Sequence, residues 1–369
     1  MNDHRIRRRI AALRKQAGMK QDQLAHALGF KDRQTVSAIE TGERQVSAAE
    51  LVQLAEVLDV DLSFFSDPFI LVDEGSFSWR RNEVPAETIE RFELRAGSWL
   101  ALYRHLSRAA GAPVNSLVPR LDLTERSSFE EAAAEGEAIA MQLELTPVPA
   151  VELEKALTEK LGALVLQIDA PDGISGAACR LGGLNVILVN RSESMARRAF
   201  NMAHELFHLA TWDHMPPEHI ESIRVQGNGN PRAEQLANAF AGGLLVPRVS
   251  LKSFVGRYPR PEPSGQAEWI RMLAGLMNVS GQAMKWRLKD LGYLRRAEVQ
   301  RIDDNELRVD MEINRQKPPP FSRGFMERLS SGIEHGQLTV RKAAQVMGLT
   351  IDEMKSLFEA HGIPIPFDL

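Results

Sequence analysis

The chain has 369 residues, of which 44% are hydrophobic and 25% charged, and a formal net charge of −4. This length accommodates two or three domains, and the composition is ordinary for a globular protein. No apolar run approaches the ~20 residues of a membrane helix, and the charged N-terminus lacks the apolar core of a signal peptide. Cys179 is the only cysteine, which excludes an internal disulfide. We therefore expect a cytoplasmic protein with no membrane partner.

Residues 1–68 predict a compact domain of five short helices. We expect these helices at 6–16, 21–28, 32–40, from Ser47 onward and at 62–65, with Glu50 completing a capping box on Ser47. Residues 1–44 contain ten Lys/Arg and five Asp/Glu, a net charge of +5, whereas residues 45–66 carry −4. A helix, a tight turn and a second helix form a helix-turn-helix pattern, and the basic excess lies on that part.

The run QDQLAHALGFKDRQTVSAIETGER closely resembles the lambda-repressor-like (XRE) family, over residues 6–65. The resemblance implies that helix 32–40 enters the major groove of double-stranded operator DNA, and that the protein is a homodimer because each domain reads one half-site. It directs four side chains toward base edges (Arg33, Gln34, Thr35, Ser37) and three toward phosphates (Gln21, Lys31, Arg44). The alternative is a helical interaction module without DNA binding.

Residues 69–124 predict a helical connector. Pro68 and Gly75 interrupt the chain, and 86–108 form one long amphipathic helix with Phe92 and Trp99 among its apolar positions. This helix either packs on the following domain or pairs with its copy in a dimer.

Residues 125–294 predict an α+β domain. Helices are expected at 127–143 and 151–161, and strands at 163–168, 176–181 and 184–190, with Gly182-Gly183 as a hairpin turn. We expect a small antiparallel sheet, an edge of which could bind an extended peptide by β-augmentation.

The stretch NMAHELFHL, after the last of these strands, contains His-Glu-x-x-His. Ser192 or Ser194 is the expected N-cap of its helix. On that helix His204 and His208 are four residues apart and share one face, so two imidazoles can form two corners of a tetrahedral zinc site. Glu205 lies one position round the helix, where it can take a proton from water without being a ligand.

A catalytic zinc needs a third protein ligand and an open position. Glu234 opens an amphipathic run that could bring its carboxylate back to the first helix, with Asn238 one turn later as a supporting residue. The rival is His214, at metzincin spacing but with Thr211 where that pattern has glycine. We favour Glu234 because a stiff threonine does not replace the turning glycine.

His204-Glu205-x-x-His208, with Glu234-x-x-Ala237-Asn238 and Leu244-Leu245-x-Pro247 downstream, resembles the ImmA/IrrE family of bacterial metallopeptidases. The resemblance spans Glu130 to about Leu294. It implies zinc, with manganese as the alternative ion, held by His204, His208 and Glu234, and Glu205 as catalytic base. In that family the protease cleaves a helix-turn-helix repressor after a stress signal. Phe207 departs from the usual glycine, and we expect altered packing without loss of ligation.

Residues 295–320 are charged and then proline-rich, which predicts a linker, and residues 321–369 predict a small module of three helices at 325–333, 339–347 and 351–360. Basic residues are few there, which favours a helical cap or partner-binding module over a second DNA-binding unit.

The sequence thus predicts a multidomain, mainly α protein. It has a five-helix DNA-binding domain, a zincin-like α+β domain and a C-terminal helical module. The leading hypothesis is a transcriptional regulator whose zinc endopeptidase cleaves a repressor, a partner or itself. The alternative is a repressor or antitoxin-type regulator whose zinc site is structural or sensory. A third hypothesis, a housekeeping peptidase, predicts no operator binding.

Overall fold

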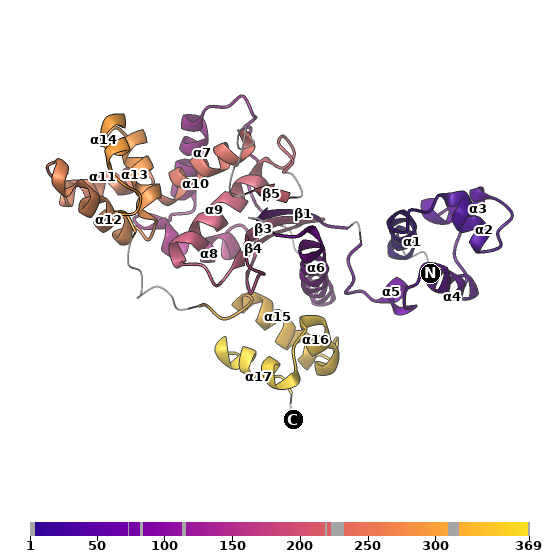
Figure 1. Cartoon of the computed structure of the whole chain (residues 1–369). Helices are drawn as coiled ribbons and strands as arrows, with labels where there is room; N and C mark the ends of the chain where they lie inside the picture. Colours follow the sequence, from indigo (N-terminus) through magenta and orange to yellow (C-terminus); the bar gives the residue numbers. More distant parts are fainter. Residues whose placement is uncertain are drawn as a thin grey trace.

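The computed structural model of the chain describes residues 4–72, 74–81, 84–112, 116–217, 220–222, 232–308 and 317–367. Its first five helices form a small domain to one side of the remaining molecule (Figure 1). They are α1 (His4–Gln16), α2 (Gln21–Ala27), α3 (Arg33–Thr41), α4 (Ala48–Val57) and α5 (Ser63–Ser66). Gly42 ends α3 at a left-handed φ of 86°, and Ser47 and Glu50 form the expected capping box of α4.

This domain has an apolar core of its own, which includes Ile10, Leu24, Ile39, Leu54 and Phe65. Arg9 is buried beside that core, and its guanidinium donates to the backbone carbonyls of Phe64, Asp67 and Ile70. These carbonyls follow the start of α5, so Arg9 ties the C-terminal end of the domain to α1. The expectation of five short helices is confirmed.

A five-stranded mixed sheet forms the centre of the remaining molecule. Its strands are β1 (Ser76–Arg81), β2 (Leu164–Ile168), β3 (Ile174–Leu181), β4 (Leu184–Asn190) and β5 (Ile220–Ser222), in the order β2-β4-β3-β1-β5. β3 and β4 form the expected hairpin, with Gly182 at a φ of 63°. β1 is antiparallel to β3, but β2 is parallel to β4 and β5 is parallel to β1. The expectation of a small antiparallel sheet is therefore wrong.

Helices cover both faces of the sheet (Figure 1). One face carries α7 (Phe129–Gln142), α8 (Pro149–Glu159), α9 (Met195–Thr211) and α10 (Arg232–Leu245). The other carries α6 (Ala86–Ala109), α15 (Arg323–Glu334), α16 (Val340–Met347) and α17 (Ile351–Ala360). Successive residues of β3 alternate between these layers, since Ala178 belongs to the first core and Ala177 and Cys179 to the second.

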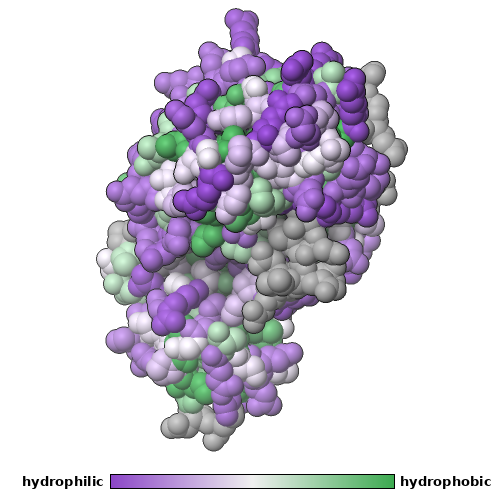
Figure 2. Space-filling view, turned by 90° about the vertical axis from the view of Figure 1, so that its left-hand side faces the viewer, coloured by the Kyte–Doolittle hydropathy of each residue, from purple (hydrophilic) through white to green (hydrophobic). Residues whose placement is uncertain are grey.

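Five further short elements close the end of the first core. They are α11 (Arg248–Arg257), the 3₁₀ turn η1 (Pro263–Gly265), α12 (Gln266–Leu276), α13 (Gly281–Asp290) and α14 (Arg296–Arg301). Figure 2 views the molecule from this side and shows a mainly hydrophilic face on which apolar residues form small separate patches. Among the described residues, no helix combines the length and the apolar character needed to cross a membrane.

Two segments expected to be connecting pieces are packed parts of the molecule. Within 69–124, β1 joins the sheet and α6, which the sequence predicts at 86–108, covers one of its faces. Within 295–320, Val299 and Leu307 are buried in the first core, while 309–316 lie outside the described residues. The three expected C-terminal helices are confirmed, but they share the second core with the sheet and α6.

Candidate metal centre

The helix that carries the His-Glu-x-x-His motif is α9, in the layer directly on the sheet. Ser194 is its N-cap, because the Ser194 hydroxyl accepts a hydrogen bond from the Arg197 amide at 3.3 Å. From Asn201 to Thr211 every residue is buried, since the sheet lies on one side and α8 and α10 on the other. The two histidines are thereby held inside the protein with little freedom to rotate.

The helix α10 brings a carboxylate to these histidines. Glu234 lies in its first turn, with Oε1 at 3.0 Å from His208 Nε2 and Oε2 at 3.2 Å from His204 Nε2. The two Nε2 atoms are 3.0 Å apart. Two ligand atoms on one tetrahedral zinc at ~2.0–2.1 Å are separated by ~3.3 Å, so these spacings are close to those of a metal site. His204, His208 and Glu234 form a group able to hold a metal ion.

The hydrogen bonding and pKa of His204 fit a metal ligand. Its Nδ1 lies 3.1 Å from Asn238 Oδ1, so an Nδ1–H donates to the amide and Nε2 turns its lone pair toward Glu234 and His208. Burial and then the nearby Arg80 guanidinium lower the pKa of His204 to about 3, which keeps the imidazole neutral. Lone pairs that converge in this way are stabilised by a cation between them.

Glu234 is charged in this arrangement. Burial alone would raise its pKa, but the close contacts with His204 and His208 hold that pKa well below its usual range. Glu234 and Asn238 are four residues apart on α10 and face the same way, so one helix supplies both a ligand atom and the support for another ligand.

Glu205 lies beside this group, between α9 and β3, and is fully buried. It lies over Gly176 of β3: a Cβ at Gly176 would be in ordinary contact with Glu205 Oε1 at 3.8 Å, but only 2.7 Å from the Leu188 carbonyl oxygen, which requires glycine at this position. Burial raises the pKa of Glu205 to about 8, although the Arg80 guanidinium and the Ala178 backbone oppose the rise. Neither carboxylate oxygen makes a regular hydrogen bond within the described part of the chain.

A buried carboxylate without a regular partner is costly, and such groups are concentrated at functional sites. The chemistry of the donor set agrees, since two neutral imidazoles and one carboxylate are borderline ligands that suit zinc. The residues present therefore fit a zinc ion with a proton acceptor beside it.

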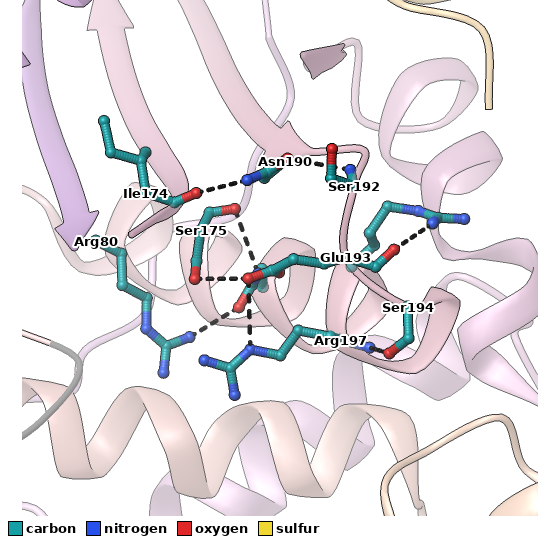
Figure 3. Close-up of polar contacts among 10 residues, drawn as sticks. Arg80, Ile174, Ser175, Asn190, Ser192, Glu193, Ser194 and Arg197 are labelled. Atoms are coloured by element: carbon teal, nitrogen blue, oxygen red, sulfur yellow. Dashed lines mark hydrogen bonds and ion pairs between the residues drawn. The ribbon is translucent and has the colours of Figure 1, made fainter. Parts of the chain in front are cut away.

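A network of buried polar groups, largely absent from the sequence-based expectations, lies against the same stretch of α9 (Figure 3). Glu193 accepts hydrogen bonds from Ser175 Oγ at 2.7 Å and from Asn201 Nδ2 at 2.5 Å. Asn201 Oδ1 in turn accepts one from Arg80 Nη1 at 3.0 Å. Burial raises the pKa of Glu193, while Ser175 and Arg197 oppose the rise. Arg80 comes from β1, a strand that the sequence analysis missed although its polar and apolar residues alternate.

The other expected residues near the motif lie as follows. His214 is about half exposed and faces Asp122 at 3.5 Å, so the structure places it away from the group of three. Phe207 is buried against His208 and Phe240, with ring centroids 5.7 and 5.6 Å apart, and the ligands still converge. His219, considered as a group that could polarise a substrate carbonyl, lies outside the described residues.

The residues expected to contact DNA lie on and around α3. Lys31, Arg33, Gln34 and Arg44 are exposed, and Gln21, Thr35 and Ser37 are half-buried. Two of the three expected phosphate contacts already have partners within the domain. Gln21 Nε2 donates to Glu40 at 2.8 Å, and Arg44 forms an ion pair with Glu50 at 2.6 Å.

Two known families match separate parts of the chain. Residues 10–65 match the helix-turn-helix family, and residues 158–289 match the M78 peptidase family, described as the IrrE N-terminal-like domain. No curated protein and no solved structure matches the chain. The matched peptidase segment contains His204, Glu205, His208 and Glu234 but not β1. The chain therefore combines an N-terminal XRE-type helix-turn-helix domain with an IrrE N-terminal-like domain of the M78 peptidase family.

Proposed function

We propose that this chain is a DNA-binding transcriptional regulator with a zinc-dependent endopeptidase, which cleaves a repressor, a partner or itself to switch gene expression. The observation that carries the proposal is the buried group of His204, His208 and Glu234, with Glu205 on the same helix as the two histidines. Three protein ligands leave a fourth position for water or substrate, which is the composition of a catalytic zinc site. Manganese is the alternative ion.

The mechanism assigns one task to each group. When bound, a divalent ion supplies a Lewis acid that polarises the scissile carbonyl and the attacking water. Glu205 takes the proton of that water and later passes it to the leaving amine. Its buried position between α9 and β3 fixes the carboxylate beside the two histidines. Asn238 keeps His204 in the tautomer that ligates through Nε2.

The helix-turn-helix domain supplies the regulatory half of the proposal. We infer that α3 enters the major groove of operator DNA, with Arg33, Gln34, Thr35 and Ser37 toward bases, and Gln21, Lys31 and Arg44 toward phosphates. The exposure of Lys31, Arg33 and Gln34 supports this orientation. Operators with two half-sites require two domains, so we propose that the chain acts as a homodimer. Cleavage of such a regulator between its domains would release one half from the other and weaken operator binding.

One observation favours a second function. His204, His208 and Glu205 are fully buried, and Glu234 is 4% exposed, as expected for a closed metal site. In that case the ion would be structural or sensory, and the chain would be a repressor or antitoxin-type regulator without proteolysis. The two functions differ in whether Glu205 is needed, because a closed metal site requires its ligands but no proton acceptor.

The decisive experiment compares the wild-type chain with Glu205→Gln, and with Glu152→Gln, an exposed glutamate on α8, as the matched control. Metal content and cleavage are measured together, with the protein itself and helix-turn-helix repressors as substrates. We expect one equivalent of zinc in all three proteins, and a loss of cleavage of at least about 100-fold in Glu205→Gln alone, since general-base catalysis contributes ~10²–10⁴-fold. Zinc in every protein with regulation unchanged in Glu205→Gln would support the sensory function. A wild-type chain that binds no metal would contradict both.

A further inference from the structure

The strand β1 brings a buried arginine to the metal-binding side of the sheet. Phe77 and Trp79 point into the second core, so the alternate residues Ser78 and Arg80 point toward α9. Arg80 is 6% exposed and pairs across the strands with Gly176, the glycine beneath Glu205. The register shifts between Arg80 and Arg81, and irregularities of this kind re-aim side chains next to functional sites.

The contacts of Arg80 place its guanidinium one helical turn from the motif. Nη1 donates to Asn201 Oδ1 at 3.0 Å, and the guanidinium carbon lies 5.6 Å from the centre of the Phe200 ring. Phe200 and Asn201 each precede a residue of the motif, His204 and Glu205, by four positions. One turn of α-helix rises ~5.4 Å, so the cation lies about one turn before the first ligand and the proposed base on α9.

The surrounding network holds this guanidinium in place. The Asn201 amide has a fixed orientation, because its Nδ2 donates to Glu193 while its Oδ1 accepts from Arg80. Glu193 also accepts from Ser175, and Arg197 lies 3.9 Å from it (Figure 3). Glu193 therefore has polar partners other than Arg80, including the Arg197 guanidinium. The need to neutralise the Glu193 carboxylate does not by itself explain why Arg80 is buried here.

The charge of Arg80 is fixed on the side of the sheet that faces the motif, since Arg80 pairs with Gly176 beneath Glu205 and donates to Asn201 of α9. A fixed cation in a buried site costs no reorganisation during a reaction, and it acts at lower dielectric than in water. Such a group is suited to stabilise negative charge that develops beside Glu205.

We propose that Arg80 binds the scissile carbonyl oxygen of the peptide substrate and stabilises the negative charge that this oxygen gains on attack; this inference rests on the endopeptidase function proposed above. In the attack, water forms a bond to the carbonyl carbon, its proton passes to Glu205, and the carbonyl electron pair moves onto the oxygen. The pair returns as the carbon–nitrogen bond breaks, and Glu205 gives the proton to the leaving amine. Arg80 donates hydrogen bonds throughout and keeps all its protons, as an arginine does in proteins.

The variants for the test are Arg80→Met, which removes the charge at similar length, and Arg80→Lys, which keeps a charge but loses the planar fork of donors. Arg180→Met is the matched control. Arg180 lies on the adjacent strand β3, with its guanidinium 5.8 Å from the Trp212 ring, but its ion pair with Asp213, at 2.7 Å, lies outside the metal centre. Zinc stoichiometry and thermal unfolding of each full-length variant verify that the fold and the centre are retained.

The first readout does not require a known substrate. The cobalt-substituted protein is titrated with inorganic phosphate, an oxyanion that mimics the tetrahedral carbon centre, and binding is followed in the visible spectrum. Since removing one donor to a developing oxyanion costs ~10²–10³-fold in kcat, we expect roughly 100-fold weaker phosphate binding in Arg80→Met. Arg80→Lys should recover part of this loss, and Arg180→Met should bind phosphate as the wild type does.

The second readout uses any protein that the wild type cleaves. We expect kcat to fall about 100-fold in Arg80→Met with KM changed only a few-fold, because the interaction strengthens in the transition state. Unchanged phosphate affinity and kcat in a folded, zinc-loaded Arg80→Met would overturn the role of Arg80 and leave the endopeptidase intact. A wild-type protein that holds cobalt, but neither binds phosphate nor cleaves any protein, would instead refute the endopeptidase, and the role of Arg80 with it. If Arg80→Met does not fold, the test rests on Arg80→Lys. Wild-type phosphate affinity together with an unchanged kcat in Arg80→Lys would contradict the proposal that the guanidinium donors of Arg80 bind the oxygen.

Discussion

The contact between His204 Nδ1 and Asn238 Oδ1 is a single hydrogen bond, but it decides which nitrogen of the imidazole faces the metal centre. Without this acceptor the buried ring could equally carry its proton on Nε2, the atom that lies 3.2 Å from Glu234. Supporting hydrogen bonds of this kind raise the basicity of a ligand and fix its orientation. The energetic importance of Asn238 should therefore appear in metal affinity rather than in folding alone.

We predict that Asn238→Leu weakens zinc binding by ~10–100-fold, the usual effect of removing such a partner, and leaves one zinc per chain at saturation. Asn238→Asp is the control, because it keeps an acceptor at the same position, and it should bind zinc at least as tightly as the wild type. Competition with a chelator of known affinity measures both variants. Equal affinity of Asn238→Leu and the wild type would show that the tautomer of His204 is set by another group.

The residues of the centre differ in how far the sequence could predict them. The shared face of His204 and His208 follows from helical spacing alone. Glu234 is predicted from the downstream motif, but its approach to the histidines depends on how the second helix packs on the first. Arg80 and Gly176 could not be placed by spacing, because Gly176 meets α9 through the packing of that helix on β3, and Arg80 through the pairing of β1 with β3. A signal for β1 did exist in the alternation Ser76, Phe77, Ser78, Trp79, but alternation identifies a strand without naming its neighbour.

The position of α10, and so of Glu234, depends on a close approach between two helices. A Cβ at Gly243 of α10 would lie 2.0 Å from the Ala133 carbonyl oxygen of α7, and one at Gly136 of α7 would lie 2.2 Å from the Phe240 carbonyl oxygen of α10. The two backbones are therefore in contact at positions where only glycine fits. This contact holds α10 across the first core, with its N-terminal turn at the histidines.

We predict that Gly243→Ala lowers the free energy of unfolding by ~1–3 kcal/mol, the usual cost of overpacking, and also weakens zinc binding because α10 must move. The adjacent Gly242 is the matched control, since a Cβ there meets nothing within 4 Å. Gly242→Ala should be neutral or stabilise the protein by up to ~1 kcal/mol through helix propensity. Denaturant unfolding and chelator competition test both variants. Similar behaviour of the two variants would contradict a backbone contact between α7 and α10.

At the scale of elements, the sequence predicts those features that depend on neighbouring residues, such as helix caps and hairpin turns. The capping box of α4, the N-cap at Ser194 and the hairpin at Gly182 all appear as expected, because each depends on residues within a few positions. The parallel pairing of β2 with β4 depends on a crossover through the whole hairpin, and the sequence pattern carries no record of it. The same reason explains why 295–307 looked like a linker: only the fold shows that Val299 and Leu307 reach the first core.

The described residues of the whole molecule form three apolar cores, and the boundaries of these cores do not follow the expected domain boundaries. The helix-turn-helix domain has a separate core. The second core joins α6 and one face of the sheet to α15, α16 and α17, with Trp99, Phe321 and Phe325 in edge-on and stacked contact at its centre. Lys342 of α16 also forms an ion pair with Asp67 at 2.7 Å, at the exit of the first domain. The C-terminal module is thus a structural layer of the peptidase half.

This arrangement predicts that a chain ending at residue 308 does not keep the native fold, because it leaves the α6 face of the sheet open to water. Exposed apolar surface costs ~25 cal/mol per Å², and an aromatic residue such as Trp99 buries ~150–250 Å², or ~4–6 kcal/mol, so exposing the apolar residues of this face costs a free energy comparable with the whole stability of a typical domain, ~5–15 kcal/mol. We expect aggregation or dye binding typical of exposed apolar surface, and loss of the cooperative thermal transition of the sheet-containing half in circular dichroism, while the helix-turn-helix domain, with its own core, still unfolds cooperatively. A chain that begins at residue 67 is the matched control. It lacks only the helix-turn-helix domain, whose core is separate, so the remaining protein should unfold cooperatively and bind one zinc. If the chain ending at 308 unfolds at the same temperature as the full-length protein, the second core does not depend on the C-terminal helices.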